Sequence, residues 1–340
     1  MRLLVAGYAG AGNLGDEALL AGLLGALHAR GIEAWVASAD PPATRAQHGV
    51  VAVGRLGGVL GALARVDAVV SGGGGLLQDA TSFRSLAFYL GVVAAARAAR
   101  KPVAVFAQSL GPLSPRGERA VQRVLRGVPL GLRDAPSLDL AARLGLAAHP
   151  VADTALLLAT PPPAAGGGAL VLVPRAGYPY MTDALAALAR PWRAGGGAVR
   201  VASLDPGRDA GETARLLAAV AGAERWSADR PEVLLAGFAG AHAVLSGRLH
   251  GLVLGTVAGV PVAGIAYDPK VAGFAARIGA PVADVPRDAA AVAATVVQLA
   301  PFVAAPSRDA AAADRERRAA EAGVAWLLRE ALHVPSSPRP

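Results

Sequence analysis

Three basic residues in the last third of the chain have the side chains that bind small organic anions. Arg248 and His250 stand in the segment Ser-Gly-Arg-Leu-His-Gly, and Lys270 follows in Tyr-Asp-Pro-Lys. The chain holds 33 lysines and arginines, yet Lys101 and Lys270 are its two lysines, so a lysine here runs against the composition. A guanidinium fork, an imidazole and a compact ammonium suit a ligand that carries both a carboxylate and a phosphate.

The segment between these residues, 251–266, is apolar and predicts a helix followed by a strand. That arrangement would bring the three basic side chains together at one end of a sheet. The structural alternative is a cationic rim that forms salt bridges with Asp268 and Asp284.

Short apolar segments alternate with helical patterns along the chain, which is typical of a parallel sheet covered on both faces. The expected strands are 2–8, 33–38, 67–71, 102–108, 169–174, 198–202, 243–246 and 261–265. The expected helices include 16–30, 85–100, 182–193, 211–221, 231–238 and 249–257.

A proline run followed by glycines at 160–168 predicts a linker. We therefore expect an α/β protein with two doubly wound, Rossmann-like domains over 1–160 and 169–308, which face a cleft. A closing helix is expected over 309–334, before a frayed tail from 335. Ligands of such sheets bind beyond the carboxyl ends of the strands.

The composition limits the classes of partner that the protein is expected to bind. The formal charge is +8, but the basic residues are scattered and aromatic residues make up 4% of the chain, which argues against nucleic acid as a partner. The charge suits an anionic substrate or an anionic membrane surface. The chain has no cysteine, no metal-ligand spacing, no signal peptide and no membrane span, so we expect a cytoplasmic protein that can contact the inner face of the membrane.

The loop after the first expected strand contains G-x-G-x-x-G over residues 10–15, for which Asp40 could hold a dinucleotide ribose. However, Asp16 and Glu17 occupy the first helical turn. Their carboxylates would take up the amides and the positive helix end that a pyrophosphate needs. Two interpretations of Asp16 stay open: it caps the helix, or it binds the acceptor or transfers a proton.

Further strand ends also carry candidate loops. The four glycines 72–75 follow an expected strand and either bring backbone amides to a ligand or form a tight turn. Ser109 lies in the next loop. Arg133 follows a short apolar run and either pairs with Asp134 or faces the cleft.

Together these motifs resemble the polysaccharide pyruvyl transferase family, and within it the CsaB-type enzymes that modify bacterial secondary cell-wall polymers. The resemblance runs along most of the chain and rests on the order and spacing of the motifs. Where the family's early loop is polar or aromatic, this chain has Ala9 and Ala11. The matching segments are 7–8, 12–18, 72–79, 108–112, 133–134, 151–153, 247–250 and 267–270.

The resemblance implies a GT-B-like fold and a transferase that forms a pyruvate ketal with phosphoenolpyruvate as donor and without a metal or other cofactor. Arg133, His250 and Lys270 would bind the donor, with Arg248 beside them, and His250 or Asp16 would relay protons. The acceptor would be ManNAc of a lipid-linked secondary cell-wall polysaccharide precursor, a polymer used in S-layer anchoring. The other residues expected to line the cleft or contact the acceptor are Asn13, Glu17, Gly73, Gly74, Gln78 and Ser109.

Two other functions stay open on the sequence. A GT-B glycosyltransferase with a nucleotide-sugar donor would hold a diphosphate with Arg248 and Lys270, although the first following acid that could hold a ribose is Asp284. A non-catalytic sugar-phosphate-binding protein would keep the same basic cluster and release no phosphate.

Overall fold

The computed structural model of the protein describes residues 1–55, 57–162 and 168–334. Residues 163–167 of the expected linker and the expected frayed tail from 335 lie outside the described residues.

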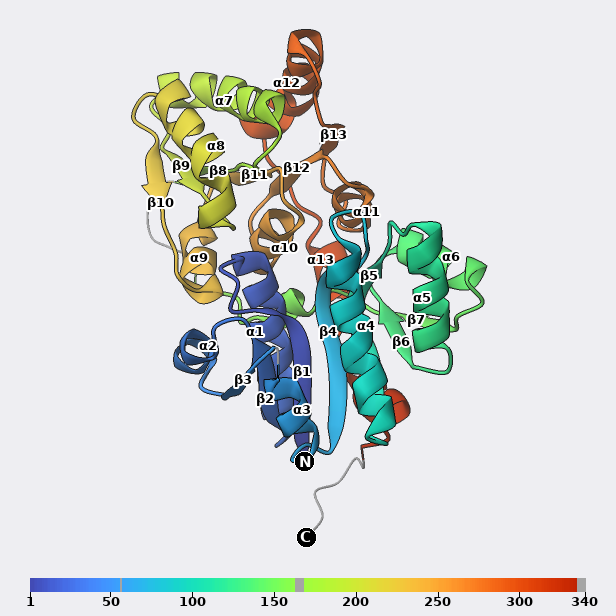
Figure 1. Cartoon of the computed structure of the whole chain (residues 1–340). Helices are drawn as coiled ribbons and strands as arrows, with labels where there is room; N and C mark the ends of the chain where they lie inside the picture. The colour runs from blue at the N-terminus through green and yellow to red at the C-terminus, as the bar shows by residue number, and fades with distance from the viewer. Residues whose placement is uncertain (56, 163–167, 335–340) are drawn as a thin grey trace. The chain divides into compact units, whose positions relative to one another are not determined.

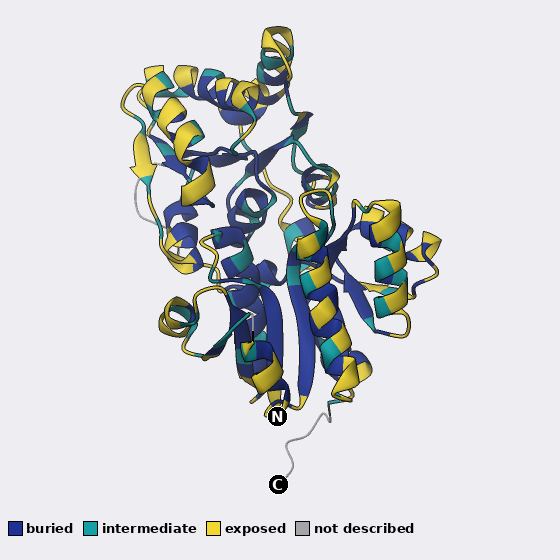
Figure 2. Ribbon diagram, viewed as in Figure 1, coloured by how far each residue is buried: buried dark blue, intermediate teal, exposed yellow. Residues whose placement is uncertain are grey.

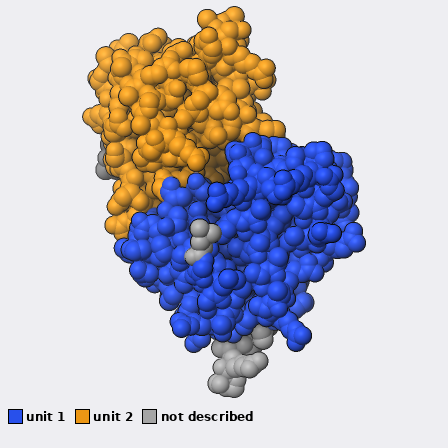
Figure 3. Space-filling model, viewed as in Figure 1, with its two compact units in different colours: residues 1–11, 16–158, 317–340 blue, residues 12–15, 159–316 orange. Residues whose placement is uncertain are grey.

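The chain divides into two compact units, which Figure 3 shows in different colours. Unit 1 comprises residues 1–11, 16–158 and 317–340, and unit 2 comprises residues 12–15 and 159–316.

In the described part of unit 1, seven parallel strands form one sheet in the order β3-β2-β1-β4-β5-β6-β7 (Figure 1). The order reverses direction between β1 and β4, which is the topological switch point of a doubly wound sheet. The strands are β1 (Arg2–Ala9), β2 (Glu33–Ser38), β3 (Val51–Gly54), β4 (Ala68–Leu77), β5 (Val103–Leu110), β6 (Leu130–Leu132) and β7 (Ala148–Pro150).

The residues of the central strands are buried, as the dark blue ribbon shows (Figure 2). Because successive side chains of a strand point to opposite faces, both faces of the sheet are covered. Leu4 and Ala6 of β1 pack in the core with α3, α4, α5 and α6, while Leu3 and Val5 pack in the core with α1. The helices of this unit are α1 (Leu14–His28), α2 (Pro41–His48), α3 (Gly58–Leu63), α4 (Phe83–Ala98), α5 (Pro115–Leu125), α6 (Ala135–Arg143) and the 3-10 turn η1 (Thr154–Leu157).

The closing helix belongs partly to unit 1. Helix α13 (Ala310–Trp326) continues into the π-helical turn η2 (Leu327–Ala331). Its apolar residues Val324, Trp326 and Leu327 are buried in the unit 1 core, where Trp326 stacks on His149 with 4.7 Å between ring centroids. The helix expected over 309–334 is therefore divided between the units because its second half fills that core.

In the described part of unit 2, six parallel strands form a sheet in the order β10-β9-β8-β11-β12-β13, with the switch point between β8 and β11. The strands are β8 (Leu170–Val173), β9 (Val199–Ala202), β10 (Glu224–Trp226), β11 (Ala243–Ser246), β12 (Val262–Ala266) and β13 (Val282–Asp284). The helices are α7 (Pro179–Ala194), α8 (Pro206–Ala219), α9 (Pro231–Phe238), α10 (Leu249–Val257), α11 (Pro269–Arg277) and α12 (Ala289–Ala304).

Helices cover both faces of this sheet as well. Leu172 and Leu245 pack in one core with α7, α8 and α12. On α10, a glycine permits close approach to the sheet, because a Cβ added to Gly255 would lie 2.4 Å from Cγ1 of Val262. Two doubly wound parallel units confirm the fold class expected from the sequence.

One loop expected from the sequence is part of a strand. The four glycines 72–75 lie inside β4, which continues to Leu77, because the ladder with β5 extends through Gly74–Gln108 and Leu77–Leu110. Glycine is still required at two of these positions, because Gly73 and Gly74 have positive φ values of 65° and 98°, which other residues seldom adopt.

Candidate active site

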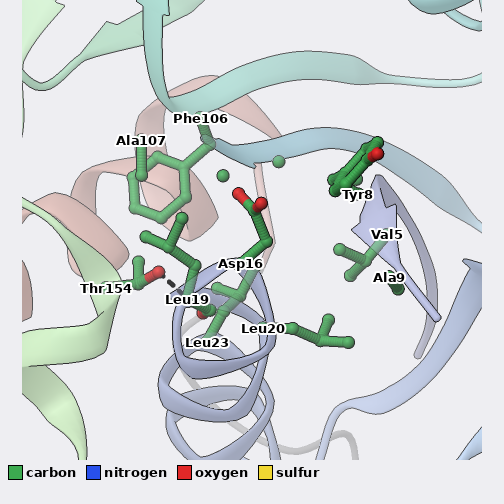
Figure 4. A pocket seen from close by; sticks show the side chains of 13 residues that line it. Val5, Tyr8, Ala9, Asp16, Leu19, Leu20, Leu23, Phe106, Ala107 and Thr154 are labelled. Carbon is green, nitrogen blue, oxygen red and sulfur yellow. Dashed lines mark hydrogen bonds between the residues drawn. The ribbon is translucent and has the colours of Figure 1, made fainter. Parts of the chain in front are cut away.

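A pocket lies at the switch point of unit 1. The carboxyl ends of β1, β4 and β5 and the first turns of α1 line it. The carboxylate of Asp16 is directed into this pocket, between the rings of Phe106 and Tyr8 (Figure 4). Ligands of doubly wound sheets bind at this position, so the pocket is the candidate site of unit 1.

The backbone around the pocket departs from regular strand geometry. Ala107, which lines the pocket, has a φ of 52°, a value that residues other than glycine seldom adopt. A backbone conformation of this kind persists only where the surrounding structure enforces it. β-Bulges, at which the register of a strand shifts, redirect side chains and are common beside active sites. The strand register shifts between Ala6 and Ala9 in β1, between Gly74 and Leu77 in β4, and between Val105 and Gln108 in β5.

Asp16 is not the cap of α1. The helix begins at Leu14, and the side chain of Asn13 accepts a hydrogen bond from the backbone N–H of Gly15 at 2.9 Å, so Asn13 is the cap. Asp16 stands in the first turn of the helix and not at its N-cap. Its carboxylate lies close to Gly74, where an added Cβ would stand 2.9 Å from Oδ1.

Glu17 stabilises the glycine loop from inside unit 1. It is 3% exposed, it accepts a hydrogen bond from the backbone N–H of Gly10 at 2.7 Å, and it lies 2.9 Å from Nε2 of His48. As predicted, a carboxylate therefore accepts a hydrogen bond from a backbone amide of this loop. Asp40 caps α2 by accepting a hydrogen bond from the N–H of Ala43. Both acids serve the fold here, so Glu17 does not line the surface that we expected to meet the acceptor.

Arg133 lies in a buried polar network beyond β6. Its Nη1 donates to Asp153 at 2.7 Å, and its Nε donates to the hydroxyl of Ser109 at 3.1 Å. Ser109 in turn donates to Asp134, which caps α6. The ion pair therefore joins Arg133 to Asp153 and not to Asp134, and Ser109, 0% exposed, belongs to this network and not to an open cleft wall.

The three basic residues of unit 2 lie at one edge of its sheet, as the sequence predicts. Arg248 stands between β11 and α10, His250 is the second residue of α10, and Lys270 is the second residue of α11, which follows β12. Strands β11 and β12 pair in parallel, so both helices start at the same edge. Free backbone amides and the helix dipole make such starts attractive to anions.

Arg248 is held by two acids at the start of α8. Its Nη2 donates to Asp209 at 2.5 Å and lies 3.9 Å from Asp205. Asp209 is fully buried and Arg248 is 8% exposed. The alternative interpretation of these basic residues as a salt-bridged rim named Asp268, whose carboxylate lies 4.0 Å from Nζ of Lys270. It did not include the two acids that hold Arg248.

His250 packs against the glycine loop. Residues 12–15 belong to unit 2, where the backbone N–H of Leu14 donates to the carbonyl of Leu204 at 2.7 Å. A Cβ added to Gly15 would lie 2.3 Å from Nδ1 of His250. The last glycine of G-x-G-x-x-G is therefore required by close packing against this imidazole.

One family profile, described as polysaccharide pyruvyl transferase, matches residues 13–269, which is most of the chain. The chain belongs to the polysaccharide pyruvyl transferase family. The matched segment contains Asp16, Arg133, Arg248 and His250, and Lys270 is the next residue after it.

Solved structures share the fold of this pyruvyl transferase at low sequence identity. The UDP-GlcNAc 2-epimerase of Neisseria meningitidis, bound to UDP-GlcNAc, has a TM-score of 0.62 at 12% identity and covers 97% of this chain and 99% of its own. The corresponding epimerase of Methanocaldococcus jannaschii gives 0.58 at 12%, covering 94% and 99%. MurG of Acinetobacter baumannii gives 0.53 at 13%, covering 96% and 99%. These likenesses confirm the GT-B-like fold, and no curated protein sequence matches the chain.

Family membership makes the chain a transferase that acts in polysaccharide pyruvylation, which removes the interpretation as a non-catalytic binding protein. No helix in the described part of this pyruvyl transferase is both long and apolar enough to cross a membrane.

Of the other residues expected to line the cleft, some line the unit 1 pocket and others do not. Gly73 lines the unit 1 pocket, whereas the side chain of Gln78 hydrogen-bonds Thr81. Tyr8 lines the pocket and was not foreseen, although it directly ends the first expected strand. Asp209 carries no sequence signal, because it is one polar residue in an ordinary helical pattern.

Proposed function

We propose that this pyruvyl transferase takes pyruvate from phosphoenolpyruvate and forms a ketal on ManNAc of a lipid-linked secondary cell-wall polysaccharide precursor. This is the activity of the CsaB-type enzymes that the sequence resembles. The observation that carries the proposal is the family match together with three basic residues at the starts of α10 and α11. Phosphoenolpyruvate bears a carboxylate and a phosphate, the two groups that such an arrangement binds.

The reaction can be written with this chain's groups. C3 of the donor gains a proton while one sugar hydroxyl adds to C2, and the bond between C2 and the phosphate oxygen then breaks. A second hydroxyl adds to C2 and closes the ketal, and its proton leaves with the released phosphate. In the proposal, Arg133, His250 and Lys270 bind the donor and stabilise the departing phosphate, with Arg248 supporting them. Asp16, or His250, transfers the protons.

The acceptor side of the proposal rests on unit 1. Its pocket combines the Asp16 carboxylate with an aromatic ring from Tyr8 and backbone from Gly73, a mixture that suits a sugar. Gly74 lies close to the carboxylate of Asp16, and Asn13 precedes Asp16 by three residues in the sequence. The net charge of +8 would favour an encounter with an anionic membrane that carries a lipid-linked acceptor at the inner face. Modified polymers of this kind would serve S-layer anchoring.

The deciding experiment measures phosphate release from phosphoenolpyruvate with a panel of ManNAc-containing acceptors. We expect release that depends on the acceptor, and thermal stabilisation of the protein by phosphoenolpyruvate. Stabilisation by UDP or GDP sugars, with no phosphate release from phosphoenolpyruvate, would instead support the glycosyltransferase alternative.

Replacing Lys270 by Ala is expected to weaken donor binding. The substitution removes a cation from the start of α11, where it would form a charge-assisted hydrogen bond worth about 1.5–3 kcal/mol. We expect the KM for phosphoenolpyruvate to rise by roughly one to two orders of magnitude.

Lys101→Ala is the matched control, since it removes the chain's other lysine, which lies in unit 1. The control is expected to keep the wild-type KM. If Lys270→Ala also keeps both KM and kcat, Lys270 does not bind the donor.

A further inference from the structure

Arg175 stands at the switch point of unit 2, in a position equivalent to that of Arg248. Strands β8 and β11 are the neighbours on either side of this point, and Val173 pairs with Ser246 in their ladder. Arg175 lies two residues after Val173, and Arg248 lies two residues after Ser246. Both therefore leave the sheet at the carboxyl edge where doubly wound folds bind ligands.

The guanidinium of Arg175 stacks on aromatic rings. It lies 3.9 Å from the centroid of the Tyr267 ring and 5.8 Å from that of Tyr178, and the two rings are 5.2 Å apart. Stacking covers the flat face of a guanidinium and leaves its N–H edge available to a planar anion. Tyr267 follows β12 and Tyr178 directly precedes α7, so two segments hold this side chain in place.

The charges around the two arginines differ. Arg248 has Asp209 and Asp205 beside it, whereas Arg175 has no carboxylate within ion-pair distance among the described residues. The Nε of Arg175 is buried and forms no hydrogen bond within that part of the chain. Asp209 also accepts from the N–H of Ala176, which ties the Arg175 loop to Arg248.

The aromatic neighbour does not neutralise this charge. Burial raises the pKa of Tyr267 above its ordinary value, so its hydroxyl stays protonated at neutral pH. A stacked, partly buried guanidinium with no counter-ion binds an oxyanion strongly, because few of its hydrogen bonds to water have to be given up.

We infer that Arg175 is a further donor-binding residue, whose N–H edge contacts the carboxylate or the phosphate of the small anionic donor. Arg248, neutralised by Asp209, would then position the Arg175 loop and the start of α10. The inference rests on the proposed function and adds to it a residue that the sequence motifs did not indicate.

The test compares Arg175→Gln with the wild-type enzyme in phosphate release and in competitive inhibition by inorganic phosphate and by pyruvate. We expect KM for phosphoenolpyruvate to rise about 10- to 100-fold, which corresponds to one charge-assisted contact. The inhibition constant of either phosphate or pyruvate should rise with it, and the one that rises identifies the donor group that Arg175 contacts. Arg175→Lys should also raise KM, because lysine loses both the stacking and the fork.

Arg200→Gln is the matched control. Arg200 also stacks on an aromatic ring of unit 2, 5.3 Å from the centroid of Trp226, but it lies within β9 and not at its carboxyl end. Its replacement should leave KM unchanged.

The outcomes separate the inference from the proposed function. A wild-type enzyme that uses phosphoenolpyruvate, with an Arg175→Gln variant of unchanged KM and inhibition constants, overturns the inference alone. If that variant does not fold, Arg175→Lys decides in the same way. A wild-type protein that neither binds phosphoenolpyruvate nor releases phosphate from it contradicts the proposed function itself.

Discussion

The Asp16→Asn variant is expected to fold as stably as the wild type and to lose about 100-fold or more of kcat. Asparagine has nearly the shape of aspartate but does not exchange a proton at neutral pH. The carboxylate of Asp16 is directed into the unit 1 pocket, beside strand ends whose backbone departs from regular geometry (Figure 4).

The expected stability follows from the local structure. Because Asn13 caps α1, the substitution removes no cap. The loss of a negative charge in the first helical turn costs only about 0.3–1 kcal/mol. Melting temperature and kcat of the purified variant, measured with a saturating acceptor, check both expectations.

Glu17→Gln is the contrasting control, since it alters the neighbouring carboxylate. Glu17 is buried against Gly10 and His48, so its replacement should lower the melting temperature and leave the kcat of the folded protein near normal. Full activity in Asp16→Asn would limit Asp16 to a structural role and leave His250 as the proton-transfer candidate.

The Arg133→Ala variant is expected to lose about 3–5 kcal/mol of its free energy of unfolding. Arg133 and Asp153 form an ion pair at 2.7 Å with side chains 7% and 4% exposed. Removing the guanidinium leaves the Asp153 charge buried and also removes the hydrogen bond to Ser109. Chemical denaturation of the variant measures the loss.

Two further variants make this result specific. Arg143→Ala removes an exposed arginine of α6 and should change stability by less than about 0.5 kcal/mol. In Arg133→Met/Asp153→Asn both charges are gone, while asparagine can still accept the N–H of Ala155, so most of the lost stability should return. An unchanged unfolding free energy in Arg133→Ala would mean that the ion pair contributes nothing.

The same double variant tests the proposed donor contact. If Arg133 also binds phosphoenolpyruvate, the folded double variant should show a raised KM, as expected for Lys270→Ala. A wild-type KM would confine Arg133 to the buried network with Ser109 and Asp153.

Much of the fold could be predicted from local pattern. Residues 243–246 and 249–257 form the strand and the helix that their apolar spacing predicts, and Arg248 and Lys270 lie at the predicted edge of the sheet. Such predictions succeed because burial on both faces of a parallel sheet leaves a continuous apolar segment in the sequence. Of the strands that the sequence did not predict, β3, β10 and β13 are short edge strands with partly exposed residues, and β6 is a buried strand of three residues, too short to leave such a pattern.

The sequence alone therefore determined the two doubly wound sheets, the family resemblance and the basic residues at the unit 2 strand ends. Only the tertiary structure decided which acids meet which bases. Arg248 pairs with Asp209, and Glu17 meets His48, across separations of 39 and 31 residues. The spacing of residues along a strand or helix specifies only its near neighbours, whereas these pairs depend on how separate elements pack. For that reason the sequence left open whether Arg248 binds the donor or forms a salt bridge, while the structure pairs it with Asp209 and shows Arg175 stacked on Tyr267 with no acid within ion-pair distance among the described residues.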